Sequence, residues 1–384
     1  MTIRTFRTSV WASLAGLSLL LVACGDATTP TAAPSAAGST SVATSAAAAP
    51  TNTAVMVGSG SVLLNGAGAT FPVPIYSKWF QLYNTVSKDV AFNYQPIGSG
   101  AGITAITAKT VDFAGSDAPL SADQMGKAAG LLHIPTVAGA VVLASNVAGV
   151  TSLVLDGDTV SGIFQGEITK WTDPKIAALN SGVTLPEADI AVVHRSDGSG
   201  TTNIFTSYLS AVNAGWQSKV GAGTSVNWPV GLGGKGNPGV AGLVKQTDGS
   251  IGYVELAYAK SNNISYARMK NKAGQVVEAT VESTVAAANG VTIPEDFRVS
   301  IVNNADPAAW PIAGFTYLLV YQDLNNVKDQ VKATALVDFL WWATHEGQDQ
   351  AKDLLYARST PELQKRIEAE IRSITFGGKA VYTK

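Results

Sequence analysis

The 384-residue sequence is poor in the side chains that most often bind metals or form disulfides: it has one cysteine and three histidines. A single cysteine excludes an internal disulfide, CxxC redox chemistry and a cysteine-rich zinc site. Three scattered histidines argue against a histidine-based metal centre. We therefore expect no metal and no cofactor.

Charged side chains are also scarce, at 14% of the residues, and the formal net charge is −2. Without an excess of Lys and Arg there is no positive field to collect the phosphates of a nucleic acid, so we expect no nucleic-acid partner. The hydrophobic class makes up 46%, which is typical of a globular protein. A length of 384 residues favours two domains.

The N-terminus has the features of an export signal. Two arginines precede an apolar run at 10–20, which is shorter than the roughly 20 residues that span a bilayer. The run leads into LVACG at 21–25, which resembles a bacterial lipobox. This pattern predicts a lipoprotein signal peptide at 1–23 and lipid attachment at Cys24, with a buried cysteine as the alternative. The expected location is extracytoplasmic, on a lipid anchor in the cell membrane (cell envelope or periplasm).

The next segment, 24–57, consists mostly of Ala, Thr, Ser, Pro and Gly. Such a composition cannot bury enough apolar surface to offset the entropy cost of ordering, so we expect a flexible tether. A lipid anchor followed by a tether would hold the folded part near a membrane surface without a transmembrane helix.

From residue 58 onward, short apolar, β-branched runs alternate with amphipathic segments, which predicts an α/β architecture. The expected strands lie at 62–64, 90–94, 111–113, 140–144, 190–193 and 317–321. The expected helices lie at 75–84, 103–109 and 203–213, and most of 327–371 is also expected to be helical.

Three segments place glycines and a hydroxyl residue directly before a predicted helix: GAGATFP at 66–72, GSGAG at 98–102 and DGSGTT at 197–202. The first N–H groups of a helix lack intrahelical partners and carry the positive end of its dipole. Glycine lets the backbone approach a ligand closely, so each segment could bind an anion. Each segment also fits an ordinary N-cap beside turn glycines, and spacing alone does not show that the three converge.

Two charged positions strengthen the anion-site hypothesis. Arg195 follows an apolar strand directly and could grip an oxyanion with two parallel hydrogen bonds. Asp197, two residues later, could orient the guanidinium; a plain surface ion pair is the alternative. Asp117 also follows a short strand, where it could equally be a turn or cap residue.

Several long motifs occur in an order that resembles the phosphate-binding protein of the bacterial high-affinity phosphate ABC transporter. They are GAGATFP at 66–72, YQPIGSGAG at 94–102, VDFAGSDAPLS at 111–121, RSDGSGTT at 195–202, WPVGLGGKGNPG at 228–239 and IGYVELAYA at 251–259. The similarity extends over nearly all of the folded part.

The resemblance implies a type II periplasmic-binding-protein fold, with two α/β lobes joined by two crossover strands. Lobe 1 would comprise 58–146 plus 318–384, and lobe 2 would comprise 147–317. The implied function is to capture inorganic phosphate between the lobes and deliver it to the permease subunits of an ABC transporter for uptake. The protein would be a monomer and not an enzyme.

The resemblance also implies which residues bind phosphate. The matching positions are Ala69, Thr70, Phe71, Ser99, Asp117, Arg195, Ser199, Gly200 and Thr201, with Asp197 pairing with the arginine. Phe71 would donate through its backbone N–H. The sequence departs from the family at His194, where a second arginine is often found, and at Gly100-Ala101, which replaces a more hydroxylated pair.

Asp117 is an acidic residue in a predicted anion site, which needs an explanation. A carboxylate repels an anion unless the anion carries a proton. Phosphate at neutral pH keeps at least one proton and sulfate keeps none, so an ionised Asp117 would accept a hydrogen bond from phosphate and repel sulfate.

Three other functions fit parts of the sequence. His194 lies near Ser199, so a Ser–His pair in a phosphatase or serine hydrolase is one alternative, although no GxSxG segment is present. The run at 231–236 fits GxGxxG and could bind a nucleotide, but Pro229 interrupts the segment before it. A binding protein for another oxyanion, or an adhesin that keeps the fold, is the third.

Overall fold

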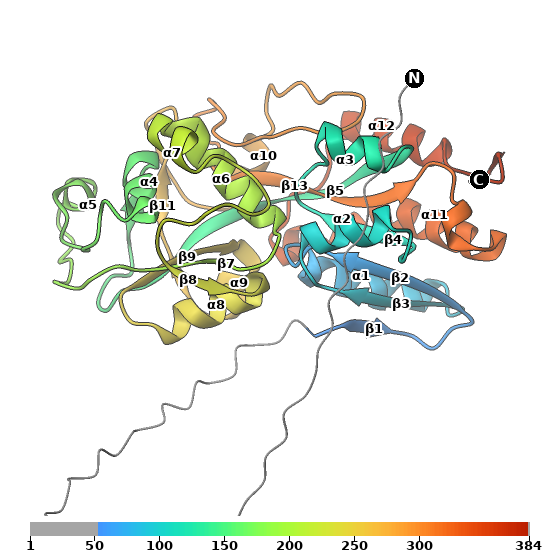
Figure 1. Ribbon diagram of the computed structural model, residues 1–384, viewed down its shortest axis with the longest axis horizontal. Coiled ribbons are helices and arrows are strands. Elements are labelled where there is room, and N and C mark those ends of the chain that lie inside the picture. The colour runs from blue at the N-terminus through green and yellow to red at the C-terminus, as the bar shows by residue number, and fades with distance from the viewer. Residues whose placement is uncertain (1–52, 383–384) are drawn as a thin grey trace, which may run out of the picture. The chain divides into compact units, whose positions relative to one another are not determined.

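The computed structural model describes residues 53–382, which form a mixed α/β fold around a ten-stranded sheet (Figure 1). The predicted signal peptide at 1–23, Cys24 and the tether up to residue 52 lie outside the described residues. The α/β architecture expected from the alternating segments is confirmed.

The strands of the large sheet include central and edge members from distant parts of the chain. They are β1 (Val55–Val57), β2 (Val62–Gly68), β3 (Val90–Gln95), β4 (Phe113–Ser116), β5 (Leu131–Asn146), β7 (Ala191–Arg195), β8 (Leu232–Gly234), β9 (Ser250–Glu255), β10 (Ser265–Tyr266) and β13 (Ala313–Tyr321). Two small sheets contain β6 (Val154–Leu155), β11 (Arg268–Lys270) and β12 (Val276–Val277), and β14 (Thr375–Phe376) and β15 (Lys379–Ala380).

The helices connect and cover these strands. The α-helices are α1 (Val73–Val86), α2 (Ser99–Thr107), α3 (Ala122–Lys127), α4 (Gly157–Gln165), α5 (Pro174–Leu179), α6 (Gly200–Val212), α7 (Ala214–Lys219), α8 (Gly236–Gln246), α9 (Leu256–Ser261), α10 (Val281–Ala286), α11 (Gln330–Thr344) and α12 (Pro361–Arg372). Short 3₁₀ helices are η1 (Asn325–Val327), η2 (Glu346–Gln350) and η3 (Lys352–Leu354).

The long strand β5 joins the two halves of the large sheet. Its residues 131–140 pair antiparallel with β13, and its residues 141–146 pair antiparallel with β9. The strand order is β1-β3-β2-β4-β13-β5-β9-β7-β8, with parallel pairs β2–β3 and β2–β4 in one half and β7–β9 and β7–β8 in the other. We call β1–β4 the first half and β7–β9 the second half.

The lobe boundaries expected from the sequence fall at the end of β5 and inside β13, and they stay a prediction. The predicted tether is too long by three residues. Val55 and Val57 pair with β3, so that β1 extends the edge of the sheet and the chain is ordered before residue 58. The short VMV run was hidden within the Ala- and Thr-rich composition around it.

Each of the six predicted strands overlaps an observed strand, but with different bounds. The strand expected at 140–144 is only part of β5, because Pro135 and Thr136 interrupt the apolar pattern of its first part. The register of β5 against β13 shifts at Thr316/Tyr317, opposite Pro135, and proline is tolerated at such an irregularity. The strand expected at 111–113 begins at Phe113 and runs to Ser116.

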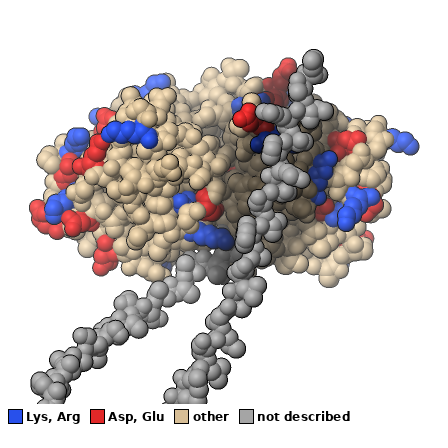
Figure 2. Space-filling view, in the orientation of Figure 1, with Lys and Arg blue, Asp and Glu red and all other residues tan. Residues whose placement is uncertain are grey.

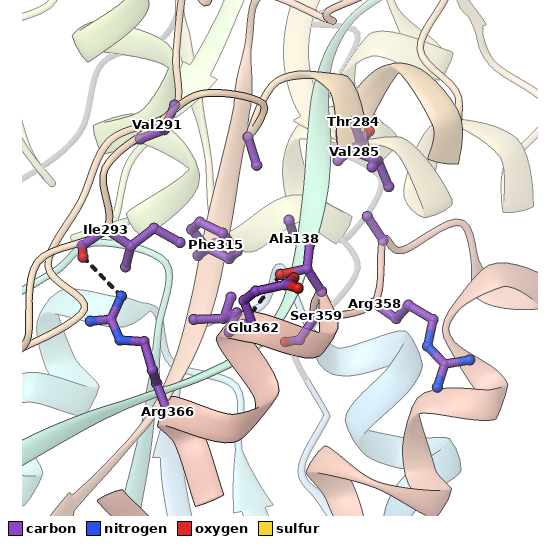
Figure 3. Close-up of a pocket in the computed structure, with 14 residues that line it drawn as sticks. Ala138, Thr284, Val285, Val291, Ile293, Phe315, Arg358, Ser359, Glu362 and Arg366 are labelled. Atoms are coloured by element: carbon purple, nitrogen blue, oxygen red, sulfur yellow. Dashed lines mark hydrogen bonds between the residues drawn. The ribbon is translucent and has the colours of Figure 1, made fainter. Parts of the chain in front are cut away.

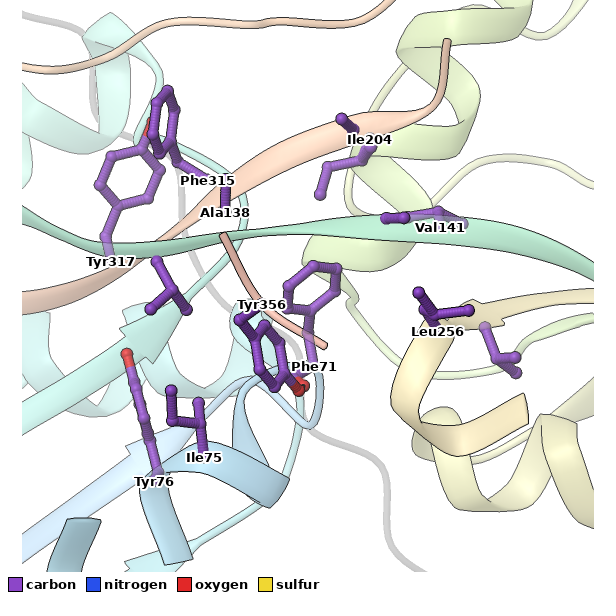
Figure 4. Close-up of a cluster of buried hydrophobic side chains, with 14 of the residues drawn as sticks. Phe71, Ile75, Tyr76, Ala138, Val141, Ile204, Leu256, Phe315, Tyr317 and Tyr356 are labelled. Atoms are coloured by element: carbon purple, nitrogen blue, oxygen red, sulfur yellow. The ribbon is translucent and has the colours of Figure 1, made fainter. Parts of the chain in front are cut away.

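The core runs without a break from the first half of the sheet to the second (Figure 4). Figure 4 shows Ile75 and Tyr76 of α1, Val141 of β5 and Ile204 of α6 in one cluster around the two long strands. Every residue of β13 is buried, so both of its faces are covered by other elements. The loops at the strand ends are therefore attached to one continuous apolar interior.

Helix α1 buries one apolar face with the spacing of an amphipathic helix. Ile75, Trp79, Phe80 and Tyr83 are buried, while Val86 at its end is 67% exposed. The Phe80 ring stacks on Phe92 of β3, with centroids 4.4 Å apart and an interplanar angle of 15°. This contact fixes the helix that follows the first glycine-rich loop.

We expect Phe80→Ala to lower the free energy of unfolding by about 3–5 kcal/mol, because it leaves a cavity in this aromatic cluster. Urea denaturation of the purified protein measures the change. Val86→Ala on the same helix is the matched control and should change the value by less than about 0.5 kcal/mol. Equal stabilities of the two variants would contradict the packing role of Phe80.

Candidate anion-binding site

The first glycine-rich loop lies between β2 and α1 and carries Ala69, Thr70 and Phe71, all buried. Tyrosine hydroxyls donate to the three carbonyl oxygens in turn. The pairs are Tyr94 to Ala69 (2.9 Å), Tyr258 to Thr70 (2.5 Å) and Tyr356 to Phe71 (2.7 Å). In a trans peptide the C=O and the next N–H point in opposite directions, so these bonds also fix where the N–H groups of Thr70 and Phe71 point.

The second loop meets the third loop across the two halves of the sheet. The Ser99 hydroxyl accepts a hydrogen bond from the Gly200 N–H (3.0 Å), and the Gly100 N–H donates to the Gly198 carbonyl (2.9 Å). Gly98 has a φ of +93°, and a Cβ there would lie 2.3 Å from Asp197 Oδ2. Glycine is therefore required at Gly98 both for its backbone conformation and for space.

Asp117 follows β4 and is buried beside these loops. The Thr316 hydroxyl donates to its Oδ1 at 2.9 Å, and Arg195 and Thr201 also act on the carboxyl group. Burial raises the pKa of Asp117 to about 7, although the Thr316 hydrogen bond, the Arg195 charge and Thr201 oppose the rise. The Gly200 Cα approaches it so closely that a Cβ there would lie 2.6 Å from Oδ2.

Arg195, the last residue of β7, has a side chain that is only 1% exposed. Its Nε donates to Asp197 Oδ1 at 2.8 Å and its Nη2 donates to Oδ2 at 2.6 Å, which is a bidentate pair. Its Nη1 lies 3.3 Å from the Thr201 hydroxyl oxygen, on the side that faces α6.

Asp197 also accepts a hydrogen bond from the Gly236 N–H, at 2.9 Å. Burial alone would raise the pKa of Asp197, but the hydrogen bonds and charge of Arg195 outweigh it and hold the pKa below its usual value. The surface ion pair that was the alternative is excluded by the burial of Arg195.

The third loop leads into α6. The Ser199 hydroxyl accepts from the Thr202 N–H at 3.0 Å, so this hydroxyl is also the N-cap that the alternative interpretation predicts. The N–H of Gly200 donates to Ser99, and the Thr201 hydroxyl lies between the side chains of Arg195 and Asn237. Ser199 can therefore cap α6 and still belong to the candidate site at the N-terminus of that helix.

Asn237 joins the first and third loops, and it was missed by the sequence reasoning. Its Nδ2 lies 3.0 Å from Thr70 Oγ1 and 3.1 Å from Thr201 Oγ1, and its Oδ1 accepts from the Glu255 N–H at 2.9 Å. The motif at 228–239 contains it and was a usable signal. Thr316 was missed because a threonine in an apolar strand carries no functional signal.

The structure therefore brings most of the predicted site residues into one buried polar cluster. Ser99, Gly200 and Thr201 contact Asp117 or Arg195, and Asn237 joins Thr70 to Thr201. The Ala69 N–H donates instead to the Gly115 carbonyl, at 2.8 Å. The cluster contains N–H, hydroxyl and guanidinium donors together with one buried carboxyl group, Asp117, which is an acceptor when ionised. Such a donor set suits a small oxyanion that carries a proton.

The residues of two alternative functions have other contacts. The His194 ring stacks on Trp228, with centroids 4.8 Å apart, and its Nδ1 lies 3.0 Å from the Arg195 carbonyl oxygen. Within the described residues no hydrogen bond joins His194 to Ser199. The GxGxxG run at 231–236 contains the edge strand β8, and its last glycine donates to Asp197.

Residues 53–382 contain no group of three or more His, Cys, Asp or Glu side chains arranged to hold a metal ion. Within the same residues, no helix combines the length and apolarity needed to cross a bilayer. Figure 2 shows small groups of acidic and basic side chains, separated by wide uncharged areas on the face in view.

A separate, mainly apolar pocket of about 240 Å³ lies beside the long strands β5 and β13 (Figure 3). Ala138 and Phe315 line it together with residues of α10 and α12, and Arg366 at its edge donates to the Ile293 carbonyl at 2.9 Å. None of the predicted site residues lines this pocket. The candidate site is therefore the polar cluster.

Comparisons with known proteins agree with this assignment. A model of the PBP superfamily domain matches residues 30–346. The phosphate-binding protein PstS of Xylella fastidiosa (strain 9a5c) is 46% identical over 313 residues, which cover 80% of this chain and 85% of that protein. The phosphate-binding protein PstS of Pasteurella multocida is 42% identical over 311 residues, covering 80% and 89%.

A solved structure gives the same result in three dimensions. A high-affinity periplasmic phosphate-binding protein (PfluDING) bound with phosphate is 25% identical, has a TM-score of 0.65, and is covered over 93% of its length by 80% of this chain. The type II periplasmic-binding-protein fold expected from the motifs is confirmed. The chain belongs to the PBP superfamily and, within it, to the PstS family of phosphate-binding proteins.

Proposed function

We propose that this chain is the extracytoplasmic substrate-binding component of a phosphate ABC transporter. It captures inorganic phosphate between its two lobes and delivers it to the permease subunits for uptake. The names of the PstS relatives support the ligand and the transport system. The chemistry of the buried polar cluster supports the same ligand independently.

The burial of Asp117 within one cluster with Arg195 is the observation that carries the proposal. A site for any anion needs donors, and the guanidinium and helix N–H groups provide them. A carboxyl group adds an acceptor, which is useful only for an anion that brings a proton. Phosphate has that proton at neutral pH and sulfate does not, so the cluster favours phosphate.

The proposed phosphate ligands are the predicted set. The backbone N–H of Phe71, the hydroxyls of the Ser and Thr residues, the N–H groups at the start of α6 and the Arg195 guanidinium donate, and Asp117 accepts; Asp197 orients the guanidinium. The set is Ala69, Thr70, Phe71, Ser99, Asp117, Arg195, Ser199, Gly200 and Thr201. Its support is that Ser99, Asp117, Arg195, Gly200 and Thr201 contact one another and that Asn237 joins Thr70 to Thr201.

Binding is proposed to couple to closure of the lobes at 58–146 plus 318–384 and at 147–317. Direct contacts between the loops of the two halves support this, since separation of the halves would break them and open the cluster to solvent. These contacts include Ser99 to Gly200, and Asn237 and Tyr258 to Thr70. β5 and β13 are the proposed crossover strands.

The protein is proposed to act as an extracytoplasmic monomer without catalysis, anchored to the cell membrane by a lipid on Cys24. The lipobox-like segment and the small-residue tether after it support the anchor. The hydrogen bonds of His194 and Ser199, which go to other groups, support a binding role over a Ser–His hydrolase.

We expect Asp117→Asn to narrow the difference in affinity between phosphate and sulfate. Loss of a charged hydrogen bond should weaken phosphate binding about 10- to 100-fold, from roughly 1.5–3 kcal/mol, while removal of the repelling charge strengthens sulfate binding. Titration calorimetry with both anions measures the two constants. Asp353→Asn, at an exposed position, is the control, and unchanged selectivity in Asp117→Asn would refute the assigned role.

The pKa of Asp117, raised by burial to about 7, predicts that sulfate binding depends on pH. Above pH 7 the carboxyl is ionised and repels sulfate; below pH 7 it is protonated and can donate to sulfate. The sulfate dissociation constant should therefore fall as the pH is lowered from 8 to 6, by at most about tenfold per unit. Competition binding at three pH values checks this, and Asp117→Asn should show a flatter profile.

Arg195→Ala should weaken phosphate binding at least tenfold, since it removes a charged donor worth roughly 1.5–3 kcal/mol. Arg195→Lys keeps the charge but loses the two-pronged pairing with Asp197, so it should recover only part of the affinity. Calorimetry on variants whose circular dichroism matches the parent protein gives the constants. The exposed Arg268→Ala is the control; a parent-like constant for Arg195→Ala would reject the contact.

A further inference from the structure

Glu255 is a fully buried carboxyl group to which the proposed function assigns no role. It is the last residue of β9, and its Oε2 caps α9 by accepting from the Ala257 N–H at 3.0 Å. Its Oε1 is also buried and accepts no hydrogen bond from any described residue. An ionised carboxylate with one oxygen left without a donor is costly in a protein interior.

The side chain next to Glu255 is Tyr356, and the hydrogen bonds of its hydroxyl decide what it can offer. The Tyr356 hydroxyl already donates its only hydrogen to the Phe71 carbonyl, at 2.7 Å. A phenol has one hydrogen but can also accept. Towards Glu255 it can therefore act only as an acceptor, and the shared hydrogen has to come from the glutamic acid.

The groups around Glu255 also favour its neutral form. The groups that act on Glu255 are Asp117 after β4, Tyr356 after η3, and the N–H groups of Ala257 and Tyr258 on α9. Burial raises the pKa of Glu255 well above its usual range, and the Asp117 charge adds to the rise; the N–H groups of Ala257 and Tyr258 oppose it. The groups with the largest effects on Glu255 include no cation.

We propose that Glu255 is a neutral carboxylic acid whose Oε1–H donates to the Tyr356 hydroxyl oxygen, which in turn donates to the Phe71 carbonyl. This relay makes Glu255 a positioning residue for the first loop. Its other oxygen holds the start of α9, from which Tyr258 donates to the Thr70 carbonyl. Glu255 thus acts on two successive carbonyls of the loop through two tyrosines.

The neutral state also protects the charge balance of the cluster. An ionised Glu255 would place a second negative charge near Asp117 and near any bound anion. As a neutral acid, Glu255 donates one hydrogen bond and accepts another without adding a charge. This consequence depends on the proposed phosphate function; the protonation state itself does not.

The test compares Glu255→Gln with Glu255→Leu and Tyr356→Phe in the full chain. Glutamine keeps a donor and an acceptor in the shape of the neutral acid, so Glu255→Gln should bind phosphate within about threefold of the parent protein. Glu255→Leu and Tyr356→Phe, which break the relay, should bind at least tenfold more weakly. Glu187→Gln, at an exposed position, is the matched control.

Ligand-free thermal unfolding between pH 5 and pH 8.5 gives the decisive readout. A pKa raised in the folded state means that its stability contribution is complete below the unfolded value, about 4.3, and is lost as pH rises towards the folded value. Glutamine does not titrate. The melting temperature of Glu255→Gln minus that of the parent protein should therefore increase as pH rises. The same difference for Glu187→Gln should not change with pH.

Infrared spectroscopy in an Asp117→Asn background should show a protonated-carboxyl band at neutral pH that Glu255→Gln removes. A pH-independent melting difference and no such band would overturn the proposal, as would phosphate binding by Glu255→Gln as weak as that by Glu255→Leu. If the parent protein itself does not bind phosphate, the proposed function fails. The two ligand-free measurements then still uphold or overturn the relay by themselves.

Discussion

The buried ion pair between Arg195 and Asp197 is the constraint around which the candidate site is arranged. A guanidinium taken out of water must keep its hydrogen-bond acceptors, and the two oxygens of Asp197 supply them. The same carboxylate accepts the N–H of Gly236 and leaves no space for a side chain at Gly98. One ion pair therefore sets the relative positions of three loops.

The other polar groups of the cluster follow from the same rule, that buried polar atoms need partners. Three tyrosine hydroxyls hold the carbonyls of the first loop, and Asn237 joins that loop to the start of α6. The site is thus shaped mainly by neutral donors. This arrangement explains how a chain with few charged residues can bind an anion: the charge is matched by oriented dipoles and one guanidinium.

Two buried carboxyl groups, Asp117 and Glu255, lie close enough to affect each other and have different roles. Asp117 shares its environment with Arg195 and hydroxyl donors, which oppose the effect of burial and keep its pKa near neutrality. The groups that most affect Glu255 include no cation, and Glu255 faces a phenol whose hydrogen is donated to the Phe71 carbonyl. In the proposed function, the surroundings, and not the residue type, would let Asp117 recognise a protonated anion and would make Glu255 a hydrogen-bond donor.

Local patterns in the sequence determined the α/β architecture, the three loops before helices and the pairing of Arg195 with Asp197, because each depends on residues close together in the chain. Only the tertiary structure decided that the loops converge, how far β5 extends, and that Asn237, Thr316 and Glu255 belong to the cluster. These contacts join residues up to about two hundred positions apart, such as Asp117 and Thr316 with a separation of 199. Burial, which sets the charge states, arises only when such distant segments pack together.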